Sequence, residues 1–201
     1  MSGHKSRLPV PDKEAIEALP PFERLGLEQV RLVNTAEQAE AAWQALQSHS
    51  VLGFDTESKP TFLREQVSDG PHIVQLATDR VAYIFQLTDP QCRARVAQLL
   101  ADPRLLKAGF GLGDDTRRIE RKLGVVPQGV VELNQLLFAR GWRREMGVKA
   151  AVAVLFGRCF AKSKKAATSN WALPQLGSSQ LLYAANDAWA ALKVYQALQD
   201  R

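Results

Sequence analysis

Hydrophobic residues in the first part of the chain fall in short runs with the two-residue period of β-strands. These runs predict strands over residues 30–33, 51–57, 72–77 and 81–87. The last two strands would form a hairpin through Thr78-Asp79-Arg80. Between the first two strands, Thr35 and Gln38 form a capping-box pattern ahead of an alanine-rich run, which predicts a helix to about residue 47.

Beyond residue 90 the period lengthens, and helical segments alternate with short apolar runs. We expect helices at about 91–100, 113–123, 134–140, 148–156 and 178–199, and strands at 105–110 and 130–133. A hairpin-linked group of strands followed by alternating strands and helices predicts a mixed central sheet with helices on both faces. The fold class is therefore three-layer α/β.

The N-terminal segment lacks such a pattern. Residues 1–26 contain four prolines and mixed charges without helical periodicity, so we expect a tail that docks loosely or is disordered. Residues 27–201 would form one domain, which is an ordinary length for a single hydrophobic core.

Composition narrows the class of protein. The chain is 46% hydrophobic and 23% charged, which argues against a largely disordered or fibrous protein. Cys92 and Cys159 have no CxxC spacing, so neither a disulfide framework nor a structural zinc site is expected, and we expect a reducing, cytoplasmic location. The N-terminus has no apolar signal-peptide core, and no run approaches the roughly 20 apolar residues that span a bilayer, so membrane and secretory roles are not expected.

Two carboxylates lie close together on the second predicted strand. Strand alternation puts Asp55 and Glu57 on one face, while Leu52 and Phe54 point to the other face and into the core. Adjacent carboxylates repel each other unless a cation joins them. A charged strand end exposed to water would give the same pattern, so the pair alone does not define a site.

A second acidic pair follows the predicted strand at 105–110, in Gly109-Phe-Gly-Leu-Gly-Asp114-Asp115. The run departs from a dinucleotide fingerprint because Asp114 replaces the third glycine and Asp115 adds negative charge where a pyrophosphate would lie. We therefore favour a cation site over a nucleotide cofactor. Capping of the following helix is the alternative role, and we expect it for one of the two aspartates.

The third acidic position lies on the last predicted helix. Tyr183 and Asp187 are four residues apart on one helical face, and the alanines around them would let the helix pack close to the sheet. An ordinary surface pair is the alternative. Together, however, Asp55, Glu57, Asp115 and Asp187 are the oxygen ligand set of a site for two Mg²⁺ or Mn²⁺ ions that catalyses phosphoryl transfer.

These motifs resemble the tyrosine subclass of the DEDD 3′→5′ exonucleases, the ribonuclease D and Werner-type exonuclease group. The resemblance covers roughly residues 30–198 and departs from the pattern at Ser58-Lys-Pro60, where Werner-type members often have Trp before a proline. The motifs that carry it are Phe54-Asp55-Thr-Glu57, Lys107-Ala-Gly-Phe-Gly-Leu-Gly-Asp-Asp115 and Tyr183-Ala-Ala-Asn-Asp187, supported by Val131-Glu-Leu133, Lys162-Ser163 and Ser169-Asn170-Trp171.

The resemblance implies an RNase H-like fold and hydrolysis of nucleic acid from the 3′ end to nucleoside 5′-monophosphates. It implies that Asp55 bridges two metal ions, that Glu57 and Asp187 complete the shell of the first ion, and that Asp115 holds the second. Asp114 is the rival of Asp115, but the spacing after Gly109 favours Asp115. Tyr183 would orient the water that attacks the phosphorus.

Basic residues are concentrated in one segment. The chain has a net charge of +5, and residues 140–165 hold eight basic residues against the single acidic Glu145, which is typical of a phosphate-binding surface. A solvated helical surface is the alternative. We expect Lys162 to contact a phosphate, and Trp171 either to stack on a base or to lie in the core. The family resemblance also implies that Phe62, Leu63 and the Gln75-Leu76 pair lie near the 3′-terminal nucleotide.

The expected substrate is single-stranded or 3′-recessed DNA, since the chain carries no helical RNA-binding domains after the last helix. Exoribonuclease activity on RNA 3′ ends is the alternative. A catalytically inactive nucleic-acid-binding module is a further alternative, against which the complete set of carboxylates argues. A dinucleotide-dependent enzyme is the weakest hypothesis, because no intact GxGxxG motif is present. The sequence does not identify a protein partner or an oligomeric state.

Overall fold

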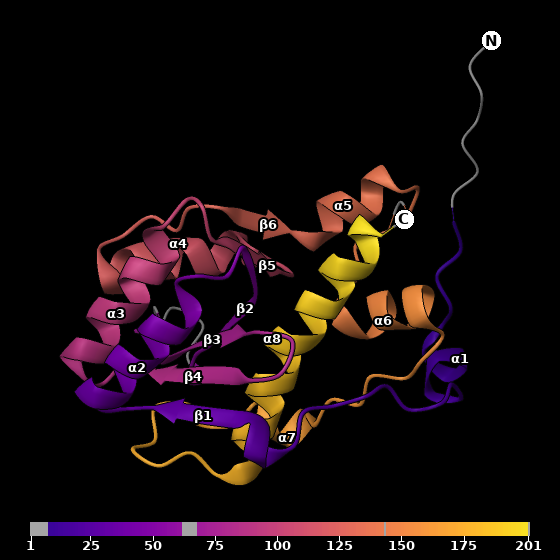
Figure 1. Ribbon diagram of the computed structural model, residues 1–201. Coiled ribbons are helices and arrows are strands. Elements are labelled where there is room, and N and C mark those ends of the chain that lie inside the picture. Colours follow the sequence, from indigo (N-terminus) through magenta and orange to yellow (C-terminus); the bar gives the residue numbers. More distant parts are fainter. Residues whose placement is uncertain (1–7, 62–67, 143, 201) are drawn as a thin grey trace.

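The computed structural model describes residues 8–61, 68–142 and 144–200. At its centre is a six-stranded sheet in the order β1-β4-β3-β2-β5-β6 (Figure 1). In this sheet β3 runs antiparallel to both of its neighbours, and the other pairings are parallel. The strands are β1 (Val30–Val33), β2 (Val51–Glu57), β3 (Ile73–Ala77), β4 (Ala82–Gln86), β5 (Leu106–Gly109) and β6 (Val130–Glu132).

Helices cover both faces of the sheet, which confirms the predicted three-layer α/β class. One face packs against α2 (Ala36–Leu46), α3 (Pro90–Ala101) and α4 (Leu112–Leu123). The long helix α8 (Ser178–Gln199) crosses the other face and contacts β1 to β5 (Figure 1). The remaining helices are α1 (Lys13–Glu17), the 3₁₀ turn η1 (Leu27–Gln29), α5 (Leu133–Ala139), α6 (Val148–Phe156) and α7 (Lys164–Ala167).

Strand alternation on β2 places the core and the site on opposite faces. Leu52 and Phe54 are fully buried against the layer of α2 to α4. Gly53 faces α8, and a Cβ atom at this position would lie 1.9 Å from the carbonyl oxygen of Ala188. Glycine and alanine therefore let α8 approach the strand closely, which brings the acidic residues of both elements together.

The long periodic elements lie where the pattern predicts them, and three short ones do not appear in the pattern. The helix α1 spans five residues, η1 three and α7 four, so none of them shows two turns of apolar periodicity. Local capping determines them instead. Asp12 accepts a hydrogen bond from the N–H of Ala15 at α1, and Ser163 accepts one from the N–H of Ala166 at α7.

Residues 8–26 differ from the expected loosely ordered tail. The N–H of Cys159 donates to the carbonyl of Pro20 (2.7 Å), and the N–H of Phe22 donates to the carbonyl of Cys159 (2.9 Å). Further along, the N–H of Leu25 donates to the side chain of Asn186 (2.8 Å). We call residues 20–26 the N-terminal strap. Isolated apolar residues with partners more than a hundred positions away leave no local period, so the pattern could not show this docking.

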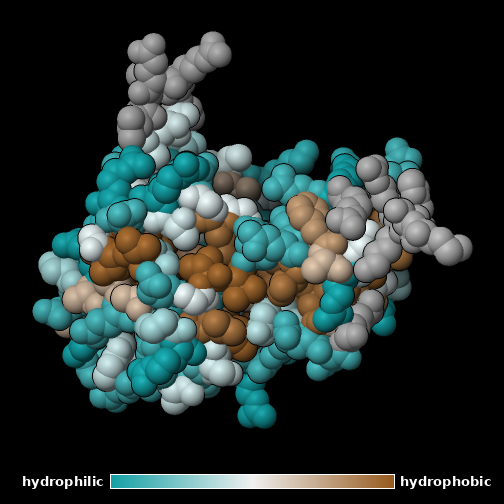
Figure 2. Space-filling model, turned by 90° about the horizontal axis from the view of Figure 1, so that it is seen from above, coloured by the Kyte–Doolittle hydropathy of each residue, from teal (hydrophilic) through white to brown (hydrophobic). Residues whose placement is uncertain are grey.

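Polar side chains make up most of the visible surface. On the face shown in Figure 2, hydrophobic side chains gather in a central band surrounded by hydrophilic residues. Large hydrophobic residues that are exposed within the described part of the chain lie on separate segments, at Leu8, Leu27, Val126 and Leu173. Across the described ranges, no helix combines the length and apolar character needed to cross a membrane.

Candidate active site

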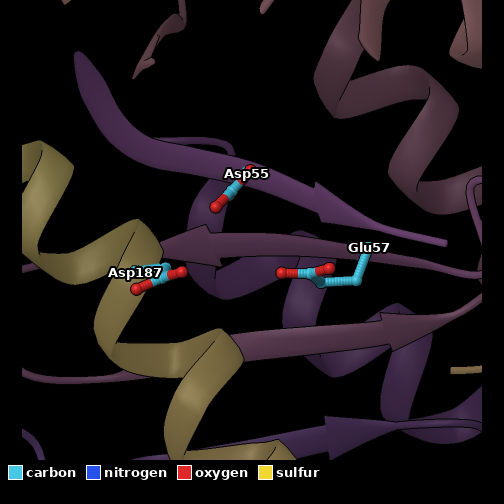
Figure 3. A group of neighbouring side chains, drawn as sticks. All are labelled: Asp55, Glu57 and Asp187. Carbon is cyan, nitrogen blue, oxygen red and sulfur yellow. The ribbon is translucent and has the colours of Figure 1, made fainter. Parts of the chain in front are cut away.

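Three carboxylates from two elements converge above the sheet. Asp55 and Glu57 project from β2, and Asp187 reaches toward them from α8 (Figure 3). One carboxylate oxygen of each residue lies within 4.8 Å of one from each of the others. The close approach of α8 at Gly53 places Asp187 at this distance. The predicted convergence of the last helix on the β2 carboxylates is therefore present in the structure.

Burial and mutual repulsion make these groups hard to ionise. Burial first, and then the charges of Asp187 and Asp115, raise the pKa of Asp55 to about 8. Burial and the charges of Asp55 and Asp187 raise the pKa of Glu57 to about 9. Burial also raises the pKa of Asp187, although the neighbouring Lys162 ammonium acts in the opposite direction. A cation among these groups would remove the repulsion that opposes their ionisation.

Asp115 approaches the same strand from its other side. The hydroxyl of Thr56, which lies between the two β2 carboxylates in sequence, donates a hydrogen bond to Asp115 Oδ1 (2.5 Å). Burial raises the pKa of Asp115, while this hydrogen bond and the charge of Arg118 lower it. Asp114, in contrast, is exposed and forms an ion pair with Arg117. Of the two candidates, the structure brings Asp115 to the end of β2.

Glu132 fixes the turn that carries Asp115. Its carboxylate accepts hydrogen bonds from the N–H of Leu112 (2.9 Å) and from the N–H of Asn134 (3.1 Å). These donors are at the start of α4 and of α5, so one side chain links the two helices. Gly111, at φ +68°, makes the turn into α4. The sequence singles out Glu132 through its motif without indicating this role.

Tyr183 lies one helical turn before Asp187 and is 7% exposed. Burial, followed by the negative charges of Asp187 and Glu57, raises the pKa of its hydroxyl far above the usual range. The phenol therefore keeps its proton and can donate a hydrogen bond. Its ring packs against Trp171, with 6.0 Å between the ring centroids.

Lys162 is at the carboxylate cluster. Its Nζ lies 2.5 Å from Asp187 Oδ2 and 5.1 Å from the centroid of the Tyr183 ring. Within this structure the ammonium neutralises part of the negative charge of the cluster. The ion pair with Asp187 places Lys162 within the candidate site. The contact between Lys162 and a phosphate stays a prediction.

Of the two roles considered for Trp171, the structure favours a place in the core over stacking on a base. Trp171 is 1% exposed and belongs to the core between α8 and the sheet, so its faces are covered by protein. Phe62 and Leu63 lie outside the described residues.

The Gln75-Leu76 pair divides between the two faces of the sheet. Leu76 packs into the layer of α2 to α4, away from the site. Gln75 pairs directly with Asp55 across the strands and is fully buried. Neither polar atom of its side-chain amide has a hydrogen-bond partner in the part of the chain that is described. Gln75 is thus a buried polar group next to Asp55 with donor and acceptor capacity to spare.

The basic segment divides between the site and the surface. Arg140 donates to the carbonyl of Leu198 near the end of α8, so it supports the fold. Five other basic residues of the segment are exposed and available to a charged partner: Arg144, Lys149, Arg158, Lys164 and Lys165.

The residues present fit divalent metal ions. Carboxylate oxygens are the ligands that Mg²⁺ and Mn²⁺ prefer, and the three of the cluster are close enough to share one ion. Burial and the mutual repulsion of the carboxylates raise the pKa values of Asp55 and Glu57 in spite of Lys162, and a bound cation would oppose the repulsion. Asp115, linked to β2 through Thr56, offers a further carboxylate.

Comparisons with a family model, with curated proteins and with solved structures all lead to 3′-5′ exonucleases. A family model described as 3′-5′ exonuclease matches residues 30–201. A 3′-5′ exonuclease of Arabidopsis thaliana is 28% identical over 154 residues, which are 74% of this chain and 52% of that protein. The exonuclease mut-7 homolog of Homo sapiens is 31% identical over 183 residues, covering 76% of this chain and 20% of that protein.

Solved structures share the fold. The Nibbler EXO domain of Aedes aegypti aligns with a TM-score of 0.75 at 25% identity and covers 89% of this chain and 90% of that chain. Ribonuclease D of Trypanosoma brucei in complex with RNA U12 aligns with a TM-score of 0.75 at 23% identity, over 94% of this chain and 65% of that chain. The RNase H-like fold that the resemblance implies is confirmed by these neighbours.

The chain spans about half the length of the Arabidopsis relative and about a fifth of the human one. The match to the family model, however, extends over nearly all of this chain and includes the acidic cluster. By sequence and by fold, this chain belongs to the 3′-5′ exonuclease family.

Proposed function

We propose that the chain is an active 3′→5′ exonuclease that hydrolyses nucleic acid to nucleoside 5′-monophosphates with two divalent metal ions. The observation that carries this proposal is the convergence of Asp55, Glu57 and Asp187, with protonated Tyr183 one turn away. An inactive binding module would have no need for three closely spaced, partly or fully buried carboxylates that repel one another. The cost of burying them argues for a ligand that stabilises them.

The carboxylates have positioning roles. Asp55, Glu57 and Asp187 would hold one ion, and Asp55 and Asp115 would hold a second. When bound, such ions activate the attacking water and stabilise the leaving oxygen. β2 and α8 hold the carboxylates rigidly from two packed layers, which keeps them in place before substrate arrives.

Tyr183 would act on the water itself. Because its hydroxyl keeps its proton, it cannot serve as a general base at assay pH. It can hold the water by a hydrogen bond and direct it toward the phosphorus. Packing against Trp171 restricts the ring, so the hydroxyl has a fixed position.

The substrate we propose is single-stranded or 3′-recessed DNA, with RNA as the alternative. Similar proteins carry names of both kinds, a bifunctional 3′-5′ exonuclease/ATP-dependent helicase WRN of Mus musculus and a ribonuclease D of Granulibacter bethesdensis. The test is a time course on 5′-labelled DNA and matched RNA in Mg²⁺, Mn²⁺ or EDTA. We expect a metal-dependent ladder that shortens from the 3′ end. Binding without cleavage in either metal would favour the inactive module instead.

Replacing Tyr183 by phenylalanine is expected to lower kcat by about 10- to 100-fold, because one hydrogen bond to the reacting water is lost. The Mn²⁺ concentration for half-maximal rate should be unchanged, since the carboxylates are intact. Tyr195→Phe is the matched control, because Tyr195 lies on the same helix and packs in a different cluster. Equal rates for Tyr183→Phe and the wild type would remove Tyr183 from the mechanism.

A further inference from the structure

The N-terminal strap holds the residue next to Asp187. Asn186 is fully buried, and its side chain accepts from the N–H of Leu25 (2.8 Å) and donates to the carbonyl of Leu25 (3.2 Å). Asn186 also donates to the carbonyl of Leu182, one turn earlier on α8 (2.8 Å). Both backbone groups of Leu25 are thereby fixed to the helix turn that carries Asp187.

The strap also holds the segment that carries Lys162. The backbone groups of Pro20 and Phe22 hydrogen-bond to Cys159, so Pro21 and Cys159 form a short parallel bridge three residues before Lys162. The Phe22 ring anchors this contact, with its centroid 5.1 Å from that of Phe156 and 5.7 Å from that of Trp189. The strap therefore connects the two chain segments that meet at the ion pair between Lys162 and Asp187.

Between these two anchors, Arg24 points out of the strap. Phe22 and Leu25 face the protein, whereas Arg24 is exposed. The hydrogen bonds between Leu25 and Asn186 place the residue after Arg24 against the residue before Asp187. The strap thus carries an exposed guanidinium one residue away from its contact with the helix turn that bears Asp187.

We propose that Arg24 binds a phosphate of the nucleic acid strand whose 3′ end lies at the carboxylate cluster, and that the strap presents it there. This inference rests on the proposed exonuclease function. Residues 20–26 precede the segment matched by the family model, so neither the strap nor Arg24 is part of that match.

The chemistry of the position supports a phosphate ligand. A guanidinium can bind two phosphate oxygens at once and stays charged at every assay pH. Asp187 attracts Arg24 only while it carries uncompensated negative charge. With cations bound at the carboxylate cluster, the phosphates of a bound strand would be the negative charges left for Arg24 to bind. Because Arg24 is exposed, its side chain is free to contact such a strand without rearrangement of the fold.

The competing role is that of a counter-ion that only stabilises Asp187. The two roles differ in what Arg24→Gln changes. If Arg24 is only a counter-ion of Asp187, Arg24→Gln changes the melting temperature of the protein in EDTA and leaves the salt dependence of oligonucleotide binding unaltered. A phosphate contact affects KM and the salt dependence, because each neutralised phosphate of a single strand contributes about 0.7 to the slope of log K against log salt.

The experiment uses the full chain with Arg24→Gln, Arg24→Lys and Arg104→Gln. Arg104 is an exposed arginine beside Leu105 and Leu106, at the end of the sheet away from Glu57, so its replacement is the matched control for net charge. Steady-state cleavage of a single-stranded oligonucleotide in Mn²⁺ gives kcat and KM. Fluorescence anisotropy of the same labelled oligonucleotide in Ca²⁺, at several NaCl concentrations, gives the binding slope.

For Arg24→Gln we expect KM to rise about 5- to 10-fold, kcat to stay within about 2-fold and the salt slope to fall by about 0.7. Arg24→Lys should recover part of the loss in KM. An unchanged KM and slope in Arg24→Gln, or the same change in Arg104→Gln, would overturn the proposal. If the wild type binds but does not cleave, the exonuclease proposal fails by itself, and the binding slopes still decide the role of Arg24.

Discussion

Asp55→Asn is expected to lower the exonuclease rate by about 10³-fold or more, since it removes the carboxylate shared by both proposed metal positions. Asparagine has nearly the same shape, so the packing between β2 and α8 should persist. The loss should appear in kcat at saturating Mn²⁺ in the oligonucleotide time course. Asp187→Asn should have a comparable effect.

The same variant should gain stability without metal. The pKa of Asp55 is about 8 in the folded protein, above its ordinary value of 3.8, because burial and the nearby carboxylates oppose its ionisation. The wild-type protein is therefore progressively destabilised as pH rises from about 4 to about 8, and asparagine avoids this loss. We expect the melting temperature of Asp55→Asn in EDTA to match that of the wild type near pH 4 and to exceed it by about 5 °C at pH 8.

The matched control is Asp114→Asn. Asp114 is next to Asp115, is exposed and pairs with Arg117, so its loss should change both rate and melting temperature little. A rate loss in Asp114→Asn as large as in Asp115→Asn would show that the second proposed metal position was assigned to the wrong aspartate. A marked drop in the melting temperature of Asp55→Asn in EDTA would contradict the repulsion between the carboxylates.

Mn²⁺ is expected to raise the melting temperature of the wild-type protein, and to raise it more at pH 9 than at pH 5. In EDTA, the raised pKa values of Asp55 and Glu57, about 8 and about 9, make stability decline as pH increases toward 9. At high pH the ionised groups are ready to bind the cation, whereas at pH 5 the cation must displace protons. At 100 times the dissociation constant, binding adds about 2.7 kcal/mol, or roughly 5 to 10 °C.

Differential scanning fluorimetry at pH 5, 7 and 9, with Mn²⁺ and with EDTA, measures this effect. Asp55→Asn is the control, since it should lose most of the gain while the remaining surface carboxylates are unchanged. An equal gain at pH 5 and pH 9, or a gain retained in Asp55→Asn, would show that the ion binds elsewhere on the protein.

Much of the fold follows from local patterns. The last helix occupies 178–199 as its alanine-rich pattern predicts, because a long helix holds its period over many turns. The alternation on β2 correctly separates Asp55 from the core residue Phe54. With α8 packed on that face, the approach of Asp187 to β2 follows from spacing and small side chains alone.

The features that the sequence did not predict depend on contacts between segments that are distant in sequence. Residues 1–26 are predicted to be loose because they contain four prolines and mixed charges without a helical period. Phe22 and Leu25 are single apolar residues of this segment, and their partners lie far away in sequence, near residues 156–189. The ion pair between Lys162 and Asp187 likewise joins a loop to a helix with no shared period. The sequence marked Lys162 as basic and close to the last helix, but side-chain direction in a loop is set by its neighbours in space.

The order of the elements along the chain has a consequence for biosynthesis. Asp187 comes more than a hundred residues after Asp55, on the final helix of the described fold. Contacts between residues so far apart form late, after the intervening chain has been made and folded. A nascent chain that has completed only the sheet has two of the three clustered carboxylates and no Tyr183. The proposed nuclease activity would therefore be absent near the ribosome until translation has passed α8.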